Sequence, residues 1–341
     1  MGLFRARTPE PVNVLEGVDA VLADLDGVVY KGADPIPHAV ESLQRVAADG
    51  IRLGYITNNA SRTDAQVAEH LSSFGLTVSA ADVVTSPQAA MRILTTLVDP
   101  GSPVLVVGGI GLVSEVEKAG LVVTRSADDR PAAVVQGFAP DVGWTQLAEA
   151  SFALHDPAVH WVATNTDWTI PVARGIAPGN GTLVSAVHTA VGRLPVVAGK
   201  PEIPIFQEAV KRFEATAPLF IGDRLDTDIL GANRAGMPSV LVLTGIDKAK
   251  QALAAVPAER PTFILEDLRQ LHEPYPVTVF SKDKSQATVN GASVRIHGAD
   301  VEIVAVGDDG INLLRAACAV IWASGRPIYG LNVPESLYLG R

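Results

Sequence analysis

The chain has 341 residues, of which 48% are hydrophobic and 19% charged, and its formal net charge is -10. This length allows two or three domains with cores of their own, and the composition is that of a globular protein. The acidic balance argues against a general nucleic-acid-binding role, which requires a basic face. No apolar run reaches the roughly 18 residues needed to span a membrane.

The N-terminal residues 1–11 are polar, basic and proline-containing, and they lack the apolar segment of a secretory signal. We therefore expect them to form a flexible tail. The single cysteine, Cys318, excludes an intramolecular disulfide and any metal site of the CxxC type. It lies in an apolar helical segment, so it is expected to pack in a core, and a lone cysteine fits a cytoplasmic protein.

Residues 12–100 and 196–275 show strands that alternate with helices. The expected strands are Val18–Ala23, Ile51–Ile56, Val83–Thr85, Leu219–Ile221 and Ser239–Leu243, and the expected helices are His38–Ala48, Thr63–Phe74, Gln88–Leu97, Pro204–Phe213 and Thr227–Ala235. This alternation predicts an α/β fold with a doubly wound, Rossmann-like parallel sheet. In such sheets ligands bind at the carboxyl ends of the strands.

A second α/β unit is expected between these halves, at residues 101–195, after the boundary signal Pro100-Gly101-Ser102-Pro103. Within it, residues 109–114 come close to a dinucleotide-binding fingerprint, but Ser114 stands where the third glycine is required. A tight turn from strand to helix is the more economical interpretation. We therefore expect no nicotinamide cofactor.

The last part of the chain, residues 276–341, predicts a small α+β module after a linker at Glu273–Pro276. Asn290-Gly291 between apolar stretches is typical of a two-residue hairpin turn. A helix is expected at Asn312–Ala323, a final strand at Arg326–Leu331 and a tail from residue 336. Packing or dimerisation is the expected role of this module.

The first segment with chemical potential follows strand Val18–Ala23 and reads Asp24-Leu25-Asp26-Gly27. Two side chains at i and i+2 of an extended strand point the same way, so both carboxylates can share one small space. A cation such as Mg²⁺ would hold both ionised, and Gly27 allows the backbone to turn sharply beside a ligand. The alternative is a surface turn, since Asp and Gly are common turn residues.

Three further segments also place polar groups after apolar runs. Gly54–Asn59 ends in Thr57 and Asn58, which suit phosphate oxygens, although Asn59 or Ser61 could instead cap the next helix. Lys200 follows the apolar run Leu194–Val197, which is expected to be a buried strand of the core, and it can balance a phosphoryl charge. The fourth segment carries the acids Asp223, Asp226 and Asp228, and its alternative interpretation is a capped helix start.

These four segments, in this order and at strand ends, resemble the haloacid dehalogenase-like phosphatases. The stretches DLDGVVY, TNN, GKP and GDRLDTDI are similar to the branch with phosphoglycolate, glycerol 3-phosphate, p-nitrophenyl phosphate and pyridoxal phosphate phosphatases. The resemblance covers about residues 15–273 and implies that residues 101–195 are an inserted α/β cap. A chain with this C-terminal module also resembles the actinobacterial glycerol 3-phosphate phosphatases.

The resemblance implies a Mg²⁺-dependent phosphomonoester hydrolase with an aspartyl-phosphate intermediate. Asp24 would be the nucleophile, and Asp26 the acid that protonates the leaving group and then the base that activates water. Mg²⁺ would be held by Asp24, the main-chain carbonyl of Asp26, and Asp223. Asp228 would orient a metal-bound water or Lys200.

The resemblance also implies how the phosphate is held. Thr57 and Asn58 would bind its oxygens, helped by main-chain N–H groups near Asp26 and Gly27. Lys200 would balance the negative charge that Asp24 and the phosphate share.

The expected cap loop over the site is Asn165-Thr166-Asp167-Trp168, where Asp167 could accept hydrogen bonds from a substrate hydroxyl or simply stabilise a turn. The loop has no cluster of Arg or Lys that would favour a second carboxylate. Glycerol 3-phosphate is therefore favoured over phosphoglycolate. Nucleotide, sugar and pyridoxal phosphates, and a non-catalytic phosphometabolite-binding protein, remain as alternatives, and a homodimer is a possible assembly.

Overall fold

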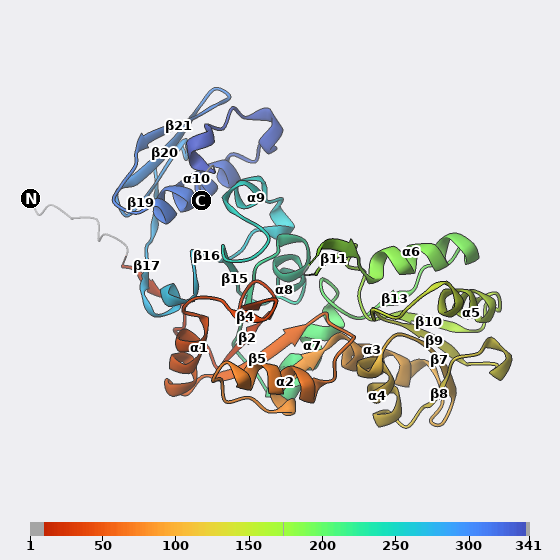
Figure 1. Cartoon of the computed structure of the whole chain (residues 1–341). Coiled ribbons are helices and arrows are strands. Elements are labelled where there is room, and N and C mark those ends of the chain that lie inside the picture. Colours follow the sequence, from red (N-terminus) through yellow and green to blue (C-terminus); the bar gives the residue numbers. More distant parts are fainter. Residues whose placement is uncertain (1–9, 173, 339–341) are drawn as a thin grey trace, which may run out of the picture.

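The computed structural model describes residues 10–172 and 174–338, and three larger sheets organise it (Figure 1). The first is a six-stranded sheet in the order β16-β15-β14-β2-β5-β6, with every pair parallel. Its strands are β2 (Ala20–Ala23), β5 (Arg52–Thr57), β6 (Val83–Thr85), β14 (Pro218–Gly222), β15 (Ser239–Val242) and β16 (Phe263–Leu265). The predicted doubly wound α/β core is confirmed.

The central strands are apolar on both faces because helices cover both sides of the sheet. Val21, Leu22, Phe220 and Ile221 have no exposed surface. The helical elements of this core are α1 (Ala39–Ala48), α2 (Asp64–Ser73), η1 (Ala80–Asp82), α3 (Ser86–Leu97), α7 (Ile203–Phe213), the π-helical turn η3 (Leu225–Ile229), α8 (Leu230–Arg234), α9 (Ala249–Ala254), η4 (Pro257–Glu259) and η5 (Leu268–His272).

Helix α2 begins with a capping box. The Thr63 hydroxyl accepts from the Gln66 N–H at 3.2 Å, and the Gln66 side-chain oxygen accepts from the Thr63 N–H at 3.0 Å. The prediction of Asn59 or Ser61 as the cap was therefore wrong. The Asn59 carboxamide oxygen instead accepts from the Ser61 N–H at 2.9 Å and shapes the loop before the helix.

The second sheet has five parallel strands in the order β13-β10-β9-β7-β8. Its elements are β7 (Pro103–Val107), α4 (Ile110–Lys118), β8 (Val122–Thr124), η2 (Ala127–Asp129), β9 (Ala133–Gln136), α5 (Trp144–Leu154), β10 (His160–Ala163), the hairpin β11 (Thr169–Val172) and β12 (Gly175–Pro178), α6 (Asn180–Val191) and β13 (Val196–Val197). We call this unit the cap. Residues 109–114 form the expected turn into a helix, because Gly109 is the N-cap of α4.

The strand before Lys200 differs from the prediction. β13 pairs with β10 at the edge of the cap sheet, and Leu194 and Val196 are 75% and 52% exposed. The expected buried core strand is therefore wrong. The parallel core sheet is already complete without it, and the apolar run Leu194–Val197 instead connects the edge of the cap to α7.

The cap is not separated from the core by solvent. One hydrophobic cluster contains Leu22 and Phe220 of the core sheet, Leu94 of α3, and Leu112 and Val116 of α4. Helix α3 contacts both α7 and α4, so it is packed between the two units. The domain limits at about residues 100 and 196 stay a prediction, since a shared cluster crosses them.

The third sheet is antiparallel, in the order β18-β19-β20-β21, and is packed on a single long helix. Its elements are β18 (Thr278–Phe280), β19 (Gln286–Val289), β20 (Ala292–His297), β21 (Asp300–Ala305), α10 (Gly310–Ser324), η6 (Ile328–Gly330) and η7 (Glu335–Leu337). The predicted hairpin is confirmed, and Asn290 and Gly291 have the positive φ angles of 43° and 85° that such a turn needs. Cys318 is buried on α10, as expected.

The module formed by residues 276–338 packs directly on the core. The Trp322 indole N–H donates to the Ala252 carbonyl at 3.2 Å, and the Arg315 guanidinium donates to the Ile264 carbonyl at 2.9 and 2.8 Å. Leu225 and Ile229 of η3 share one hydrophobic cluster with the buried face of α10. These contacts support the packing role that was expected for this module.

Two smaller expectations in the C-terminal part of the chain were wrong. The linker at Glu273–Pro276 contains β17 (Pro274–Tyr275), which pairs antiparallel with β1 (Val12–Asn13). Another two-residue pair, β3 (Tyr30–Lys31) and β4 (Asp34–Pro35), forms a short hairpin. Arg326–Leu331 contains a 3-10 turn instead of a strand, because its groups bond locally.

The two expected tails lie largely outside the described residues. Residues 1–9 and 339–341 are not described, so the flexible N-terminal tail stays a prediction. Leu337, which was assigned to the C-terminal tail, is fully buried in the cluster around α10. Within the described parts of the chain, no helix combines the length and apolar character needed to cross a bilayer.

Candidate active site

Asp24 and Asp26 lie just beyond the carboxyl end of β2, in the middle of the core sheet. The Asp24 N–H donates to the Ile221 carbonyl at 2.8 Å, which continues the ladder between β2 and β14. The Asp24 side chain is buried, whereas that of Asp26 is exposed to solvent. The two carboxylates therefore have different environments, one enclosed by protein groups and one at the open edge of the site.

Gly27 brings two neighbouring loops close together. Its φ is 86°, and a Cβ at this position would lie 2.3 Å from Oδ2 of Asp223. A side chain here would displace that carboxylate. The Gly27 N–H already donates to the Tyr30 carbonyl at 2.9 Å. This contact occupies only the Gly27 donor, so the expectation that main-chain N–H groups near Asp26 and Gly27 help hold the phosphate stays a prediction.

Thr57 and Asn58 follow at the end of β5, next to β2. Thr57 is buried, and its hydroxyl oxygen accepts from the Asn59 N–H at 3.1 Å, which leaves the hydroxyl proton for another acceptor. The Asn58 carboxamide oxygen accepts from the Lys200 N–H at 2.8 Å, and its NH₂ donates to the Lys200 carbonyl at 3.0 Å. The Asn58 side chain therefore fixes the Lys200 loop. The expected contact of Asn58 with phosphate stays a prediction.

Lys200 is the buried cation of the site. Its Nζ lies 2.6 Å from Oδ1 of Asp24 and 2.7 Å from Oδ1 of Asp228. The other Asp228 oxygen, Oδ2, accepts from the N–H groups of Asp223 and Arg224, each at 3.1 Å. Since both Asp228 oxygens are engaged, this carboxylate orients Lys200 and the loop that follows β14.

The electrostatics of the site follow from burial of several charges together. Burial raises the pKa of Asp24 to about 7, against the opposing charge of Lys200, and Asp228 raises it further. Burial likewise raises the pKa of Asp223 to about 8, with Asp228 and Asp24 adding to the effect. Burial alone would lower the pKa of Lys200, but Asp228 and Asp24 together outweigh it and the net shift is upward.

Burial and neighbouring charges also shift the pKa of Asp26, which lies at the open edge of the site. The protein atoms around Asp26 desolvate it and raise its pKa, while Lys200, Arg62 and His70 act in the opposite direction. A carboxyl group with a raised pKa holds a proton more readily, which suits a group that donates one.

Three buried carboxylates are close enough to share a metal ion. Oxygens of Asp24, Asp223 and Asp228 all lie within 4.8 Å of one another. Carboxylate oxygens are the ligands that Mg²⁺ prefers, and a divalent cation would offset the repulsion that raises the pKa values of Asp24 and Asp223. The residues present therefore fit Mg²⁺. The Asp26 carboxylate is not in this group, and the expected contribution of its main-chain carbonyl stays a prediction.

The cap reaches the site through the loop that follows β10. Both carboxylate oxygens of Asp167 accept from the Asn58 NH₂ at 3.2 Å, and the Asn165 NH₂ donates to the Asn58 carbonyl at 2.7 Å. Burial raises the pKa of Asp167, against Asn58, Arg224 and Lys200. Asp167 thus lies beside Asn58, one of the residues expected to bind phosphate, while Trp168 is exposed.

The loop Thr244–Lys248 is a functional segment that the sequence reasoning missed. The Ile246 N–H donates to Oδ2 of Asp223 at 2.6 Å, and the Thr244 hydroxyl donates to the Gly27 carbonyl at 2.7 Å. A Cβ on Gly245 would lie 1.8 Å from Oδ2 of Asp223. A Thr-Gly pair after the apolar strand Ser239–Leu243 was the available signal, since close backbone approach to a ligand group requires glycine.

Asp226, which was expected to be a capping residue, is instead paired with Arg224 at 2.8 Å on the surface. The positive charge of Arg224, in the core, also acts to lower the pKa of Asp167, in the cap. Arg224 therefore lies near the cap loop, which no local sequence pattern indicated.

Two family models match the parts of the chain that carry these residues. A model described as haloacid dehalogenase-like hydrolase matches residues 21–122, and one described as HAD-hydrolase-like matches residues 197–271. The first range includes Asp24, Asp26, Thr57 and Asn58. The second includes Lys200 and the acidic loop that follows β14.

Two curated proteins illustrate the similarity to relatives. The chain is 45% identical to D-glycerol 3-phosphate phosphatase of Mycobacterium tuberculosis over 312 residues, which is 91% of this chain and 87% of the relative. It is 35% identical to human chronophin over 280 residues, 76% of this chain and 94% of that protein.

Solved structures of phosphatases are also similar to this chain. The glycerol phosphate phosphatase from Mycobacterium tuberculosis in complex with magnesium superposes with a TM-score of 0.84, 41% identity and coverage of 95% of each chain. The p-nitrophenyl phosphatase from Archaeoglobus fulgidus superposes with a TM-score of 0.70 and 28% identity, over 75% of this chain and 98% of that one. The similarity to the mycobacterial protein thus extends over a part of the chain that the shorter phosphatase does not match.

Proposed function

Because the chain belongs to the haloacid dehalogenase-like hydrolase family, we propose that it is a Mg²⁺-dependent phosphatase that hydrolyses glycerol 3-phosphate to glycerol and phosphate. The reaction class is carried by one observation: the buried Asp24 carboxylate lies 2.6 Å from Lys200 Nζ, beside Asp223 and Asp228. The substrate is supported by the identity of 45% with a glycerol 3-phosphate phosphatase. In this role the protein would take part in the recycling of glycerophospholipids.

In the first half of the proposed reaction, an Asp24 carboxylate oxygen attacks phosphorus and forms an aspartyl-phosphate. The bond between phosphorus and the glycerol oxygen breaks, and Asp26 donates its proton to that oxygen. Lys200, held by Asp24 and Asp228, balances the negative charge at the site. When bound, Mg²⁺ supplies positive charge that offsets the repulsion between the phosphate and the carboxylates.

In the second half, Asp26 is ionised and takes a proton from water, which attacks phosphorus and breaks the bond to Asp24. One carboxyl group performs both proton transfers because the steps are consecutive. The exposed position of Asp26 supports this assignment, since both the leaving group and water reach the site from solvent.

The phosphate oxygens would be held by the Thr57 hydroxyl and by Lys200. Asn58 would bind phosphate with them, and its side chain also fixes the main chain of Lys200. Asp24, Asp223 and the main-chain carbonyl of Asp26 would hold Mg²⁺. Asp228 would orient a metal-bound water or Lys200. Gly27 allows the close approach of Asp223, and main-chain N–H groups near Asp26 and Gly27 would help to hold the phosphate.

The cap residue Asp167 is proposed to accept a hydrogen bond from a glycerol hydroxyl. Asp167→Ala should then lower kcat/KM for glycerol 3-phosphate by roughly threefold to a hundredfold. Hydrolysis of p-nitrophenyl phosphate should fall much less, since that leaving group has no hydroxyl. Because Asp167 also bonds to Asn58, part of the loss is expected to be common to both substrates. An equal loss for the two substrates would return Asp167 to a turn-stabilising role.

We also propose a cytoplasmic location, which rests on the single cysteine, and a homodimer, which rests on the sequence-based expectation for the C-terminal module. Light scattering of the purified protein measures the second of these. A monomeric mass at all accessible concentrations would contradict the proposed homodimer.

The proposed function is tested by kcat/KM with Mg²⁺ over a panel of phosphomonoesters. The panel contains glycerol 3-phosphate, phosphoglycolate, pyridoxal phosphate, a sugar phosphate and a nucleotide. We expect the highest value for glycerol 3-phosphate. A higher value for another member would replace the substrate and keep the reaction, whereas no turnover of any member would favour a phosphometabolite-binding protein.

A further inference from the structure

The glycine-rich turn at the start of α4 is not used by the chemistry, yet it makes very close contacts with the core. A Cβ on Gly111 would lie 2.3 Å from the Arg62 carbonyl oxygen and 2.7 Å from that of Ala60. A Cβ on Gly109 would lie 3.7 Å from the Ser61 carbonyl oxygen. The first turn of this cap helix therefore rests on the main chain of residues 60–62 in the core.

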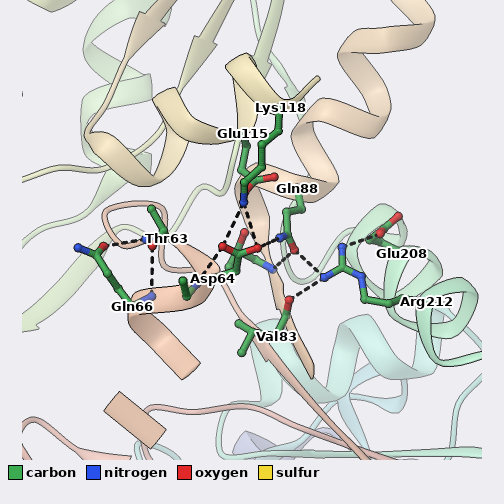
Figure 2. A network of polar contacts seen from close by, with 11 residues as sticks. Thr63, Asp64, Gln66, Val83, Gln88, Glu115, Lys118, Glu208 and Arg212 are labelled. Carbon is green, nitrogen blue, oxygen red and sulfur yellow. Dashed lines mark hydrogen bonds and ion pairs between the residues drawn. The ribbon is translucent and has the colours of Figure 1, made fainter. Parts of the chain in front are cut away.

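The other end of α4 is joined to the core by an ion pair (Figure 2). Lys118 Nζ lies 3.1 Å from both carboxylate oxygens of Asp64, the first residue of α2, and 2.6 Å from Oε1 of Glu115 on its own helix. Asp64 is only 14% exposed in its side chain, whereas Lys118 is 50% exposed. The pair thus lies at a partly protected rim between cap and core.

Asp64 is itself connected to two further core helices. Its Oδ2 accepts from the Gln88 NH₂ of α3 at 3.0 Å, and the Gln88 side-chain oxygen accepts from Arg212 of α7 at 3.0 Å (Figure 2). Arg212 also donates to the Val83 carbonyl at 2.7 Å. Lys118 therefore binds to a carboxylate whose position is fixed by the core.

Helix α4 contacts both ends of one short segment, residues 60–64. This segment directly follows Thr57 and Asn58, and Asn58 holds the main chain of Lys200 through two hydrogen bonds. A shift of residues 60–64 would be passed along the chain to these groups. The position of helix α4 can therefore determine the position of residues 57–64, which include Thr57 and Asn58.

We propose that Lys118 is a positioning residue for the phosphatase reaction: its ion pair with Asp64, together with the glycine contact at Gly111, holds residues 57–64 in register with Lys200. The proposal rests on the proposed function for its kinetic consequence. Its structural consequence, an ordered segment 57–64, does not depend on the substrate.

The experiment compares Lys118→Met with two matched variants. Lys118→Arg keeps the charge, and Arg92→Met removes an ion pair with Glu208 at 3.4 Å between two core helices that line the same groove. Lys118→Met should lower kcat/KM by about twofold to fivefold, the range of a partly exposed ion pair, and equally for glycerol 3-phosphate and p-nitrophenyl phosphate. Lys118→Arg should restore most of the loss, and Arg92→Met should match wild type.

The second readout is hydrogen–deuterium exchange of peptides that cover residues 57–66. Exchange should be faster in Lys118→Met than in wild type and unchanged in Arg92→Met, while peptides of the sheet β18–β21 exchange alike in all variants. Raising the ionic strength should speed exchange in wild type and have little effect on Lys118→Met. If Lys118→Met exchanges and turns over like Arg92→Met, the proposal is overturned.

Gly111→Ala supplies an independent variant. Alanine is favoured over glycine inside a helix, so helix propensity alone predicts a more stable α4 in this variant. We expect instead faster exchange of residues 57–66, because the added Cβ collides with the Arg62 carbonyl. Unchanged exchange in Gly111→Ala would also contradict the proposal. If the wild-type protein had no phosphatase activity, the proposed function would be refuted. The exchange results would then still test whether Lys118 orders residues 57–64.

Discussion

Asp24→Asn is expected to abolish phosphomonoester hydrolysis while leaving the fold intact. The substitution removes the oxygen that forms the bond to phosphorus, and losses on removal of a nucleophile in covalent catalysis reach about a millionfold. We expect kcat/KM for p-nitrophenyl phosphate to fall by at least about a thousandfold. The fold should survive because Asp24 follows the end of β2 and its main-chain bond to Ile221 is kept.

The matched control is Asp226→Asn, which changes an exposed carboxylate of the acidic loop after β14 that is paired with Arg224. Its activity should stay near that of wild type. Circular dichroism and the unfolding temperature check both variants. If Asp24→Asn retains activity within about tenfold of wild type, Asp24 is not the nucleophile.

Removal of Mg²⁺ by a chelator is expected to reduce turnover to background, and added Mg²⁺ to restore it. Asp24, Asp223 and Asp228 place three carboxylates within 4.8 Å, and Lys200 lies between Asp24 and Asp228 as a counter-charge. A phosphate group adds further negative charge to this site. Full activity in excess chelator would contradict the metal assignment. Asp223→Ala should raise the Mg²⁺ concentration needed for half-maximal activity.

The raised pKa values give this prediction a pH dependence. In the metal-free protein the pKa is about 7 for Asp24 and about 8 for Asp223, above the ordinary aspartate value of 3.8. The folded state therefore holds protons that the unfolded chain has lost, so metal-free stability falls as pH rises from about 4 to about 8. Mg²⁺ must displace these protons, and its affinity should rise over the upper part of this range.

Differential scanning fluorimetry measures this dependence without substrate. The rise in unfolding temperature on addition of Mg²⁺ should be larger near pH 8 than near pH 6. The same increment at both pH values would show that neither carboxyl group titrates on metal binding.

The parts of the site that sequence reasoning placed correctly are those set by local pattern and by the geometry of parallel sheets. Asp24, Thr57 and Asp223 each lie at or just after the end of an apolar strand, and the carboxyl ends of parallel strands share one edge of the sheet. The hairpin at Asn290-Gly291 was predictable for a similar reason, since its turn chemistry lies within two residues.

The parts that could not be predicted depend on pairing between distant segments. The run Leu194–Val197 is as apolar as a core strand, and only its pairing with β10 places it at the edge of the cap sheet. Asn58 looks like a phosphate ligand by type, but its side chain bonds to Lys200, 142 residues away in the sequence. The same holds for the loop Thr244–Lys248, whose contact with Asp223 follows from the order of strands in the sheet.

The measurement that tests the central claim most directly is mass spectrometry of the enzyme after acid quench during turnover of glycerol 3-phosphate with Mg²⁺. The proposed mechanism predicts one phosphoryl group on the peptide that contains Asp24, present during turnover and lost when the substrate is exhausted. The label should be missing in Asp24→Asn. Rapid release of phosphate without any labelled peptide, or a label on another residue, would contradict the proposed aspartyl-phosphate mechanism.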